Sequence, residues 1–472
     1  MPPAVDLSTI SRSTLLAVCL IITGVVYVNS WSGDFQFDDF STILENPHLD
    51  RWQNFVGHLD HMVRPVLYGT FFLDRSLYGN NATGYHLLNL LLHLGSGLLV
   101  YRILTQAVTE EARHVPFWTA LLFLIHPIQT ETVTYISGRA SGLMAFFYLL
   151  ALFLYIKKTE CFRESDGSRL YFFGAIASFL LALASKETAV TFPLALLLWD
   201  VLIRRLRGTS LRTAVVSHHL PFWVILLLVT AWVSNHPRYT ALAQFSFSIR
   251  PLWDNLLSEL HAVTYALMLF LCPWKQNFDH DLPVLHSLFQ WPLFLDLMVL
   301  SGLAIAALLA ARRLPLLSFA IGWFFVELLP TSLIPRADLL SERNLYLASI
   351  GFLLVVVIIG SRLTQWLATV LRKPRLVQIT AGSLALTLVL GLCLFTYQRN
   401  ALYRNAVLLW SDTVEKSPHK ARPHNNLGHA YAQREDWDRA IEEFRIAARL
   451  NPDYALAQQN LRDAYLHHVG RQ

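Results

Sequence analysis

Apolar stretches recur along the chain and are separated by short polar intervals. A helix that crosses a bilayer core of about 30 Å needs about 20 predominantly apolar residues. Several stretches are shorter than this, so we expect tilted or broken helices. The pattern predicts an all-α protein with a polytopic helical membrane domain. Eleven stretches reach or approach spanning length, at residues 13–30, 85–104, 115–128, 141–157, 170–184, 188–203, 217–234, 292–311, 315–333, 346–368 and 377–396.

Lysine and arginine gather in some of the polar intervals and indicate the orientation. Intervals rich in these residues face the cytoplasm, which predicts a cytoplasmic N-terminus. A twelfth apolar stretch, 256–272, contains Glu259 and His261. The basic intervals 204–207 and 312–313 share one side only if an even number of spans separates them. Two other stretches already lie between them, so 256–272 is interpreted as re-entrant or interfacial, which leaves eleven spans and an extracytoplasmic C-terminus.

The composition agrees with a membrane protein. Of 472 residues, 54% are hydrophobic and 15% are charged, whereas soluble proteins carry about 25% charged residues. The net charge of +5 comes from the basic intervals, and no basic patch interleaved with aromatic residues suggests a nucleic-acid partner. The first apolar stretch follows Arg12, lacks a convincing cleavage site and is followed at once by acids. We interpret it as an uncleaved signal anchor.

The composition changes to a soluble pattern after residue 396. Residues 421–454 match the 34-residue tetratricopeptide pattern at seven positions, with His424 in place of the usual tryptophan. The matching residues are Leu427, Gly428, Tyr431, Ala440, Phe444, Ala447 and Pro452. Partial repeats flank this unit, with Ala406, Trp410 and Pro418 before it and Leu461 and Tyr465 after it. We predict a membrane domain at 1–396 and a repeat module at 397–472, which docks on the membrane domain or on a partner because so few repeats rarely stand alone.

Three aspartates follow the first apolar stretch in the segment WSGDFQFDDFSTILEN, residues 31–46. They are Asp34, Asp38 and Asp39. Acids just beyond a span are unfavourable unless they face water, a partner or a substrate. Adjacent Asp38 and Asp39 repel each other, so one of them can hold its proton more tightly and suit general-base chemistry. Taken alone, the pair favours a solvated loop with an aspartate turn, and the later intervals reverse that preference.

The other intervals on the same side also carry polar side chains, whereas the opposite intervals are short and mostly basic. Polar chemistry gathered on one membrane face predicts an active site there. Guanidinium groups suit phosphate or carboxylate, although Arg64 could be an interfacial anchor and Glu131 or Arg139 part of a structural ion pair. The residues concerned are Arg64, His126, Glu131, Arg139, Lys186, Glu187, Asp279, His280, Asp281, Arg336, Glu342 and Arg343.

The motifs together resemble a known family, the transmembrane and tetratricopeptide-repeat-containing O-mannosyltransferase-like proteins of the GT-C glycosyltransferase superfamily. The resemblance runs in order through FDDFSTILEN, RPVLYGTFFLDRSLYG with YHLLNLLLH, HPIQTETVTYISGRA, SKETAVT and SERNLYLASIGF, and ends in the repeats. The chain differs from eukaryotic members in its short repeat region and compact loops. We therefore expect a bacterial member, located in the inner membrane.

The resemblance implies transfer of a sugar, mannose or another hexose, from a polyprenyl-phosphate carrier to an acceptor hydroxyl on the extracytoplasmic face, with inversion. An aspartate of the first outer loop takes the acceptor proton, which points to Asp38 or Asp39, with Asp38 favoured as the leading acid. The other aspartate would orient it, or hold the acceptor or a divalent cation. The positive charge that a leaving phosphate needs would come from Arg343 first, then Lys186, Arg139 and Arg64, with Glu131, Glu187, His126 and Glu342 in support.

Two other functional classes remain as alternatives. One is a non-catalytic membrane scaffold that binds proteins through its repeats, which would not need acids and arginines converging on one face. The other is a transporter for a lipid-linked sugar, which would place charges at mid-bilayer on broken helices. The charges here lie near the ends of the apolar stretches on one face. The sequence therefore favours an enzyme whose partners are a lipid-linked sugar donor and a protein bound by the module.

Overall fold

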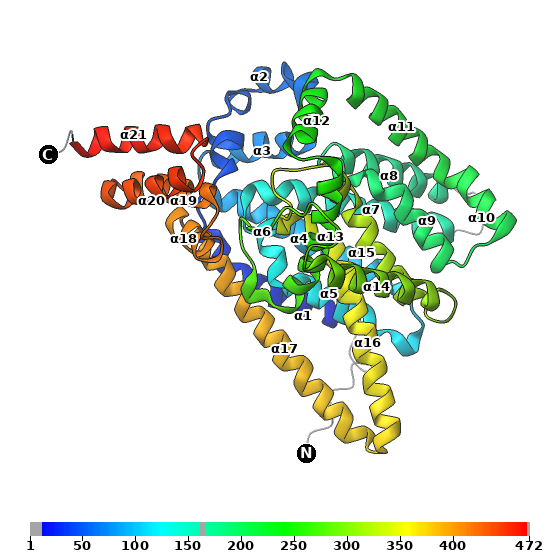
Figure 1. Ribbon diagram of the computed structural model, residues 1–472. Coiled ribbons are helices and arrows are strands. Elements are labelled where there is room, and N and C mark those ends of the chain that lie inside the picture. The colour runs from blue at the N-terminus through cyan, green and yellow to red at the C-terminus, as the bar shows by residue number, and fades with distance from the viewer. Residues whose placement is uncertain (1–11, 161–165, 470–472) are drawn as a thin grey trace.

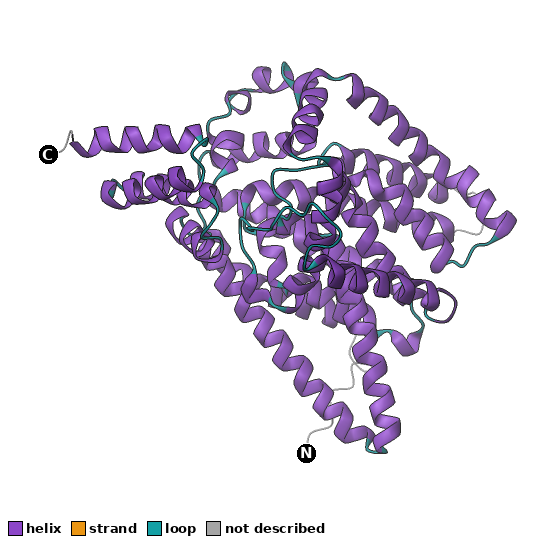
Figure 2. Cartoon of the chain, viewed as in Figure 1, coloured by secondary structure: helices purple, strands orange, loops and turns teal. Residues whose placement is uncertain are grey.

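The computed structural model describes residues 12–160 and 166–469, and this part of the chain is helical without a strand (Figure 2). Each of the eleven predicted stretches coincides with a helix. These helices are α1 (Arg12–Tyr27), α4 (Ala82–Thr105), α5 (His114–Ile125), α7 (Arg139–Glu160), α8 (Asp166–Leu183), α9 (Phe192–Leu202), α11 (Leu220–Asn235), α14 (Leu293–Arg313), α15 (Pro315–Leu333), α16 (Ala348–Leu371) and α17 (Pro374–Leu402). The predicted all-α class is confirmed.

Among the described residues, seven helical stretches are long and apolar enough to cross a membrane. They are 82–105, 136–160, 208–235, 293–313, 315–333, 348–371 and 374–402. Helices α5 and α9, with 12 and 11 residues, would each span less than about 20 Å. The number of eleven spans therefore stays a prediction, as does the re-entrant interpretation of 256–272, which forms part of one continuous helix, α13 (Leu252–Leu271).

The core of the bundle is built from helices that are apolar on more than one face. Helix α7 packs against α4 and α8, and α15 packs against α16. Nearly every residue of α5 is buried, as expected for a short helix that is hydrophobic all round. Helix α5 ends at Ile125, because Pro127 cannot continue it and His126 accepts a hydrogen bond from the backbone N–H of Ile128 instead.

Helices α16 and α17 meet at a tip and diverge from it (Figure 1). Helix α17 has 29 residues, so its two ends lie roughly 43 Å apart. The basic residues 372–375 occupy the tip, and the repeat module follows the other end of α17. Helix α6 (Thr130–Val133) packs against α17, and α2 (Trp52–Val56), α3 (Pro65–Tyr78) and α12 (Pro237–Ile249) lie on the side of the bundle away from the tip (Figure 1). We refer to this part of the bundle as the module end.

The repeat module consists of α18 (Ala406–Lys416), α19 (Ala421–Ala432), α20 (Trp437–Leu450) and α21 (Ala455–Val469). Helices α19 and α20 cross closely at Gly428, where a Cβ atom would lie 2.7 Å from the Phe444 ring. The module docks on the membrane domain through α18 and the start of α19. Arg422, for example, pairs with the buried Asp279. Helices α20 and α21 project away from the bundle (Figure 1).

Candidate active site

A polar cavity of about 240 Å³ lies at the module end, where the first loop, α3 and the segments before α7, α9 and α16 meet. Four of its side chains are basic and only one, Asp38, is a carboxylate. The cavity is lined by Asp38, Thr42, Arg64, Leu67, Tyr68, Phe71, Tyr135, Ser137, Ala140, Lys186, Arg336 and Arg343. A concave site with convergent charged groups is the expected form of a binding or catalytic site.

The structure separates the two adjacent aspartates. Asp39 is fully buried. Its Oδ2 accepts a hydrogen bond from the backbone N–H of Gln36 at 2.8 Å, and its Oδ1 accepts from the backbone N–H and the hydroxyl of Ser137. Burial raises the pKa of Asp39 to about 7, against the hydrogen bonds from Ser137 and Gln36, which lower it. Asp39 thus ties the first loop to the segment before α7.

Asp38 faces the cavity and is partly exposed. Within the described chain, no hydrogen bond or ion pair is recorded for its carboxylate. Its backbone N–H donates to the hydroxyl of the buried Tyr135 at 3.1 Å. The backbone is therefore fixed while the carboxylate remains available, which is the arrangement that a general base requires.

A close backbone approach holds the segment that contacts both aspartates. The single turn Ile136–Gly138 lies just before α7. A Cβ atom at Gly138 would lie 2.1 Å from the carbonyl oxygen of Glu131, a distance that only glycine permits. This contact places Tyr135 and Ser137 against the first loop, so the glycine of the ISGR sequence belongs to the geometry of the site.

Two of the cavity arginines are oriented by glutamates. Arg343 donates to Glu131 at 2.8 Å from Nη1 and at 3.0 Å from its backbone N–H, and the hydroxyl of Ser341 donates to the same carboxylate. Arg64 forms a bidentate pair with Glu187, at 3.0 Å from Nε and 2.7 Å from Nη2. Glu131 is buried, whereas both guanidinium groups remain partly exposed. The predicted supporting roles of Glu131 and Glu187 fit this geometry.

The other two cations of the cavity, Lys186 and Arg336, have no carboxylate partner among the described residues. Lys186 is buried and its ammonium donates only to neutral oxygens, the hydroxyl of Ser141 and the amide oxygen of Asn344, both at 2.7 Å. Burial and the nearby charge of Arg336 hold the pKa of Lys186 well below its ordinary value. In the part of the chain that the structure describes, no ion pair is recorded for Arg336 either. A bound anion would stabilise both charges.

The structure does not bring all the predicted residues to the cavity. Arg139 is fully buried beneath it and pairs with Asp74 at 2.6 Å. Its remaining N–H groups donate to Asn89, Thr70 and the carbonyl of Tyr85. Because its donors are used inside the protein and it does not line the cavity, the interpretation as a phosphate ligand is replaced by the structural ion pair that the sequence left open.

His126 and Glu342 also have structural surroundings. The Nε2 of His126 lies 3.1 Å from the carbonyl oxygen of Phe270 and ties the end of α5 to α13. Glu342 is fully buried and accepts hydrogen bonds from the backbone N–H of Asn277 at 2.6 Å and from His280 at 3.0 Å. These two residues shape the loops around the cavity but do not line it.

Tyr135 and Ser137, which contact the two aspartates, line the cavity but were not among the predicted site residues. Arg336 was named among the polar residues of this face, but no role was assigned to it. Tyr135 and Ser137 belong to the quoted TYISGRA sequence, and Arg336 lies in the same interval as Arg343. Their placement depends on contacts between distant loops, so residue type alone did not distinguish them from their neighbours.

A cation site at the aspartate pair has no support in the geometry, because Asp39 turns away from the cavity and both of its oxygens accept hydrogen bonds from the protein. Among the described residues, no group of three or more His, Cys, Asp or Glu side chains could hold a metal ion. The available carboxylate at the cavity is that of Asp38.

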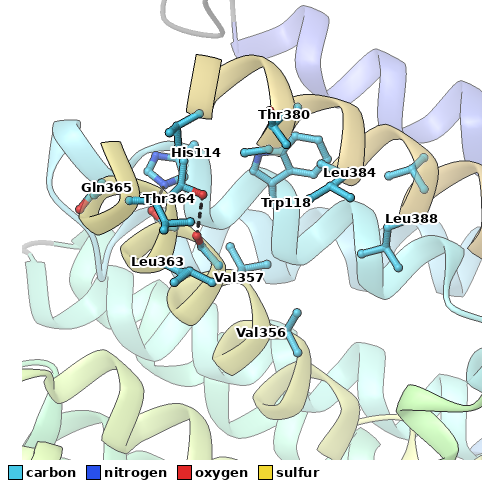
Figure 3. A pocket seen from close by; sticks show the side chains of 18 of the residues that line it. His114, Trp118, Val356, Val357, Leu363, Thr364, Gln365, Thr380, Leu384 and Leu388 are labelled. Carbon is cyan, nitrogen blue, oxygen red and sulfur yellow. Dashed lines mark hydrogen bonds between the residues drawn. The ribbon is translucent and has the colours of Figure 1, made fainter. Parts of the chain in front are cut away.

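A larger apolar groove of about 700 Å³ lies between α5, α16 and α17 (Figure 3). Leucine and valine side chains dominate its lining, and its main polar contact joins His114 to the hydroxyl of Ser361 at 2.7 Å. The groove holds no acid and no lysine or arginine. Its position along two apolar helices suits lipid rather than chemistry, so the smaller polar cavity is the candidate active site.

The fold and the cavity define a class: a helical membrane protein with a charged cavity at one end of its bundle and a tetratricopeptide repeat packed beside it. A family model described as "Tetratricopeptide repeat" matches residues 421–454, which confirms the predicted repeat and its bounds. No solved structure matches the chain significantly.

Curated relatives indicate the family that the whole chain resembles. It is 26% identical over 468 residues to Protein O-mannosyl-transferase F38B6.6 of Caenorhabditis elegans, covering 94% of this chain and 63% of that protein. It is 26% identical to Protein O-mannosyl-transferase TMTC1 of Homo sapiens, covering 92% and 55%, and 27% identical to human TMTC4, covering 89% and 64%. The resemblance to this family of O-mannosyltransferases is therefore confirmed over most of the chain, which spans between 55 and 64% of the length of these three relatives.

Proposed function

We propose that the chain is an integral-membrane glycosyltransferase of the GT-C type, which moves mannose or another hexose from a polyprenyl-phosphate carrier to an acceptor hydroxyl. The observation that carries the proposal is the cavity at the module end, where one available carboxylate, Asp38, faces four cationic side chains. A general base opposite a cluster of cations is what this transfer needs. The names of the relatives, protein O-mannosyl-transferases, support the same reaction class.

Asp38 and the four cationic side chains of the cavity each have a role in the proposed reaction. Asp38 takes the proton of the acceptor hydroxyl as its oxygen forms a bond to the anomeric carbon of the sugar. The bond from that carbon to the phosphate oxygen breaks, and its electron pair leaves with the polyprenyl phosphate. The cations stabilise the negative charge that develops on the phosphate. Asp38 lines the cavity and is partly exposed, so its carboxylate can contact the acceptor hydroxyl, as a general base must.

The charge of the cavity fits a phosphodiester donor. Its four cations face three carboxylates, namely Asp38 and the partners of Arg343 and Arg64. With Lys186 protonated, one positive charge is in excess, which matches the single negative charge of a polyprenyl-phosphate sugar. Within the described part of the chain, Arg336 and Lys186 have no carboxylate partner to release, so we assign them the first contacts with the phosphate. Arg343 and Arg64, held by glutamates, orient it by their guanidinium groups.

The number of carboxylates supports inversion. Retaining glycosyl transfer through a covalent intermediate uses two carboxyl groups close to the anomeric carbon, one of them as the nucleophile. The lining of the cavity provides one carboxylate, because Asp39 is turned into the protein. A single displacement by the acceptor, with Asp38 as the base, inverts the anomeric configuration.

The location of the cavity supports an extracytoplasmic reaction. The basic residues 372–375 lie at the opposite end of α17 from the module, and basic intervals mark the cytoplasmic side. The cavity and the module would then face outward, in a bacterial inner membrane, where the module can present a protein acceptor to Asp38. Cysteines introduced at positions 281 and 420 should react with an impermeant reagent from outside, and those at 207 and 373 should not.

A transfer assay tests the proposal. Purified protein in lipid nanodiscs is incubated with a panel of radiolabelled polyprenyl-phosphate hexoses and with acceptor peptides rich in serine and threonine. We expect label to move to peptide from at least one donor, with the anomeric configuration inverted. Nucleotide sugars serve as controls and should not be used. Failure of every lipid-linked donor, together with no binding of any of them, would reject the function.

A further inference from the structure

We propose that α18 and the turn that leads to α19 position the two halves of the active site, so that the module is part of the catalytic unit. This inference rests on the proposed function for its kinetic consequences, but its structural content can be tested alone. Two separate sets of contacts carry it. One set is aromatic and reaches the loop that bears Asp38. The other is ionic and reaches the segment that bears Arg336.

The aromatic contact lies one residue before Asp38. The ring of Phe37 meets the ring of Trp410 edge to face at a centroid distance of 5.5 Å. Phe278 completes the cluster, 5.3 Å from Trp410 and 6.1 Å from Phe37, and it also contacts Tyr135 at 5.2 Å. Trp410 is buried on α18, so the module provides one wall of the pocket that holds Phe37.

The backbone of Phe37 makes this pocket necessary. Its φ is +45°, a conformation that an aromatic residue rarely adopts and that persists only when its surroundings enforce it. The carbonyl oxygen of Tyr403, where α17 ends, adds further support by accepting from the backbone N–H of Asp34 and from the side chain of Gln36, both at 3.3 Å. The direction in which Asp38 points is thus fixed from the module side.

The ionic contact involves the segment before α16. Arg422 makes a bidentate pair with Asp279, at 2.7 and 2.6 Å, and its Nη2 also reaches Asp338 at 2.6 Å. Lys420 joins the same two carboxylates. Asp279 is buried, and Asp338 lies two residues after Arg336. The start of α19 therefore holds the backbone on which a cation of the phosphate site is placed.

The two contacts predict different kinetic consequences. Trp410 acts through the loop that bears the base, so it is a positioning residue for the chemical step. Arg422 acts through the segment that bears Arg336, so it is a positioning residue for donor binding. Helices α20 and α21 make neither contact and can accept a partner without disturbing the site.

Hydrogen exchange in the full-length protein in nanodiscs tests the aromatic contact without any activity. We expect Trp410→Ala to increase exchange about tenfold or more in the segment 34–46, because the loop opens locally once its wall is removed. Trp410→Phe keeps the edge contact and should stay near the parent. Phe444→Ala is the matched control, since it weakens the core of the repeat at α19 and α20 without touching the loop. If α20 also unfolds in Trp410→Ala, Trp410→Leu is used instead.

Kinetics then separate the two roles. We expect Trp410→Ala to lower kcat about 10²-fold with little change in the KM for donor, as a misplaced catalytic group does, and Trp410→Phe to restore it. Adding Phe37→Ala to Trp410→Ala should lower kcat little further, because both substitutions remove the same contact between Phe37 and Trp410. Arg422→Gln should instead raise the KM for donor about tenfold with kcat nearly kept.

The outcomes distinguish this inference from the proposed function. Unchanged exchange at 34–46 in Trp410→Ala or Trp410→Leu overturns the positioning role whether or not the protein transfers sugar. Increased exchange with no transfer by the parent supports the positioning and rejects the function. Equal losses of kcat in Trp410→Ala and Phe444→Ala would show a merely structural effect and would also overturn the inference.

Discussion

Two groups of charged residues at the module end both combine aspartate with basic side chains, but their surroundings differ. The cavity group is Asp38, Arg64, Lys186, Arg336 and Arg343. The core group is Asp39, Asp74 and Arg139. The carboxylates and the guanidinium of the core group have protein partners, whereas among the described residues Asp38, Lys186 and Arg336 of the cavity group have no ionic partner. We therefore propose that unused hydrogen-bonding capacity, rather than charge itself, distinguishes the candidate site from the core.

Arg139 and Arg343 illustrate the contrast, since each pairs with a buried carboxylate. Arg139 is fully buried, and Phe71 covers its guanidinium at 4.7 Å. The side chain of Arg343 is 23% exposed and opens to the cavity. A buried pair contributes little net stability, but breaking it leaves an uncompensated charge. Substitution should therefore affect folding in the core group and donor use in the cavity group.

The largest expected loss of stability is that of Arg139→Met. It should destabilise the fold by about 3–5 kcal/mol, because Asp74 is left charged and unpaired. Thermal unfolding in detergent measures the effect. The double variant Arg139→Met with Asp74→Leu should recover much of the loss. Activity lost without any change in unfolding temperature would contradict the core assignment and return Arg139 to the phosphate site.

Arg336→Gln should weaken donor binding and leave the stability of the fold unchanged. We expect the KM for donor to rise about 10–100-fold, which corresponds to one charged hydrogen bond to phosphate, with an unfolding temperature like that of the parent. The exposed Arg434→Ala is the control. Arg343→Gln should also weaken donor use, but with some loss of stability because it strips Glu131 of its partner. A donor saturation curve for Arg336→Gln that overlays the parent curve would exclude Arg336 from the phosphate contact.

Substitution of Asp39, which links the first loop to the segment before α7, should have a smaller effect on stability. Asp39→Asn places an amide among N–H donors and should cost about 1–2 kcal/mol. Since the folded pKa of Asp39 is raised to about 7, its contribution is complete below the unfolded pKa of about 4 and is lost as pH rises through 7. The stability difference between parent and variant should shrink between about pH 4 and about pH 7 and level off above that. A difference that grows with pH would contradict this environment.

The smallest expected effect is on the pH dependence of donor affinity, through Lys186. Its pKa is held well below the ordinary value, and a donor phosphate would favour its protonated form, so donor binding takes up a proton. The affinity for donor should therefore fall as pH rises above the lowered pKa, by up to about tenfold per pH unit. Isothermal titration at a series of pH values measures the slope. Lys186→Met should flatten it, and an unchanged slope in that variant would place the titrating group elsewhere.

The sequence predicted most of the fold because its signals are local. Apolar length determines the helices, and the spacing of residues such as Gly428 and Phe444 determines the repeat. The first loop could also be singled out, because adjacent acids after a span are unusual. The choice between Asp38 and Asp39 could not be derived, since it depends on Ser137, almost a hundred residues away. In the same way, the pairing of Arg139 with Asp74 on α3 and the position of Arg336 in the cavity lining depend on contacts between distant segments.

The most direct test of the account is the transfer rate of Asp38→Asn, measured with saturating lipid-linked donor and protein acceptor. The amide keeps the size of the side chain but cannot take the acceptor proton. The account predicts a loss of about 10²–10⁴-fold in kcat, roughly 3–5 kcal/mol of barrier, with the parental unfolding temperature and donor affinity. Transfer at the parental rate by a folded Asp38→Asn protein would contradict the assignment of the cavity as the reacting site.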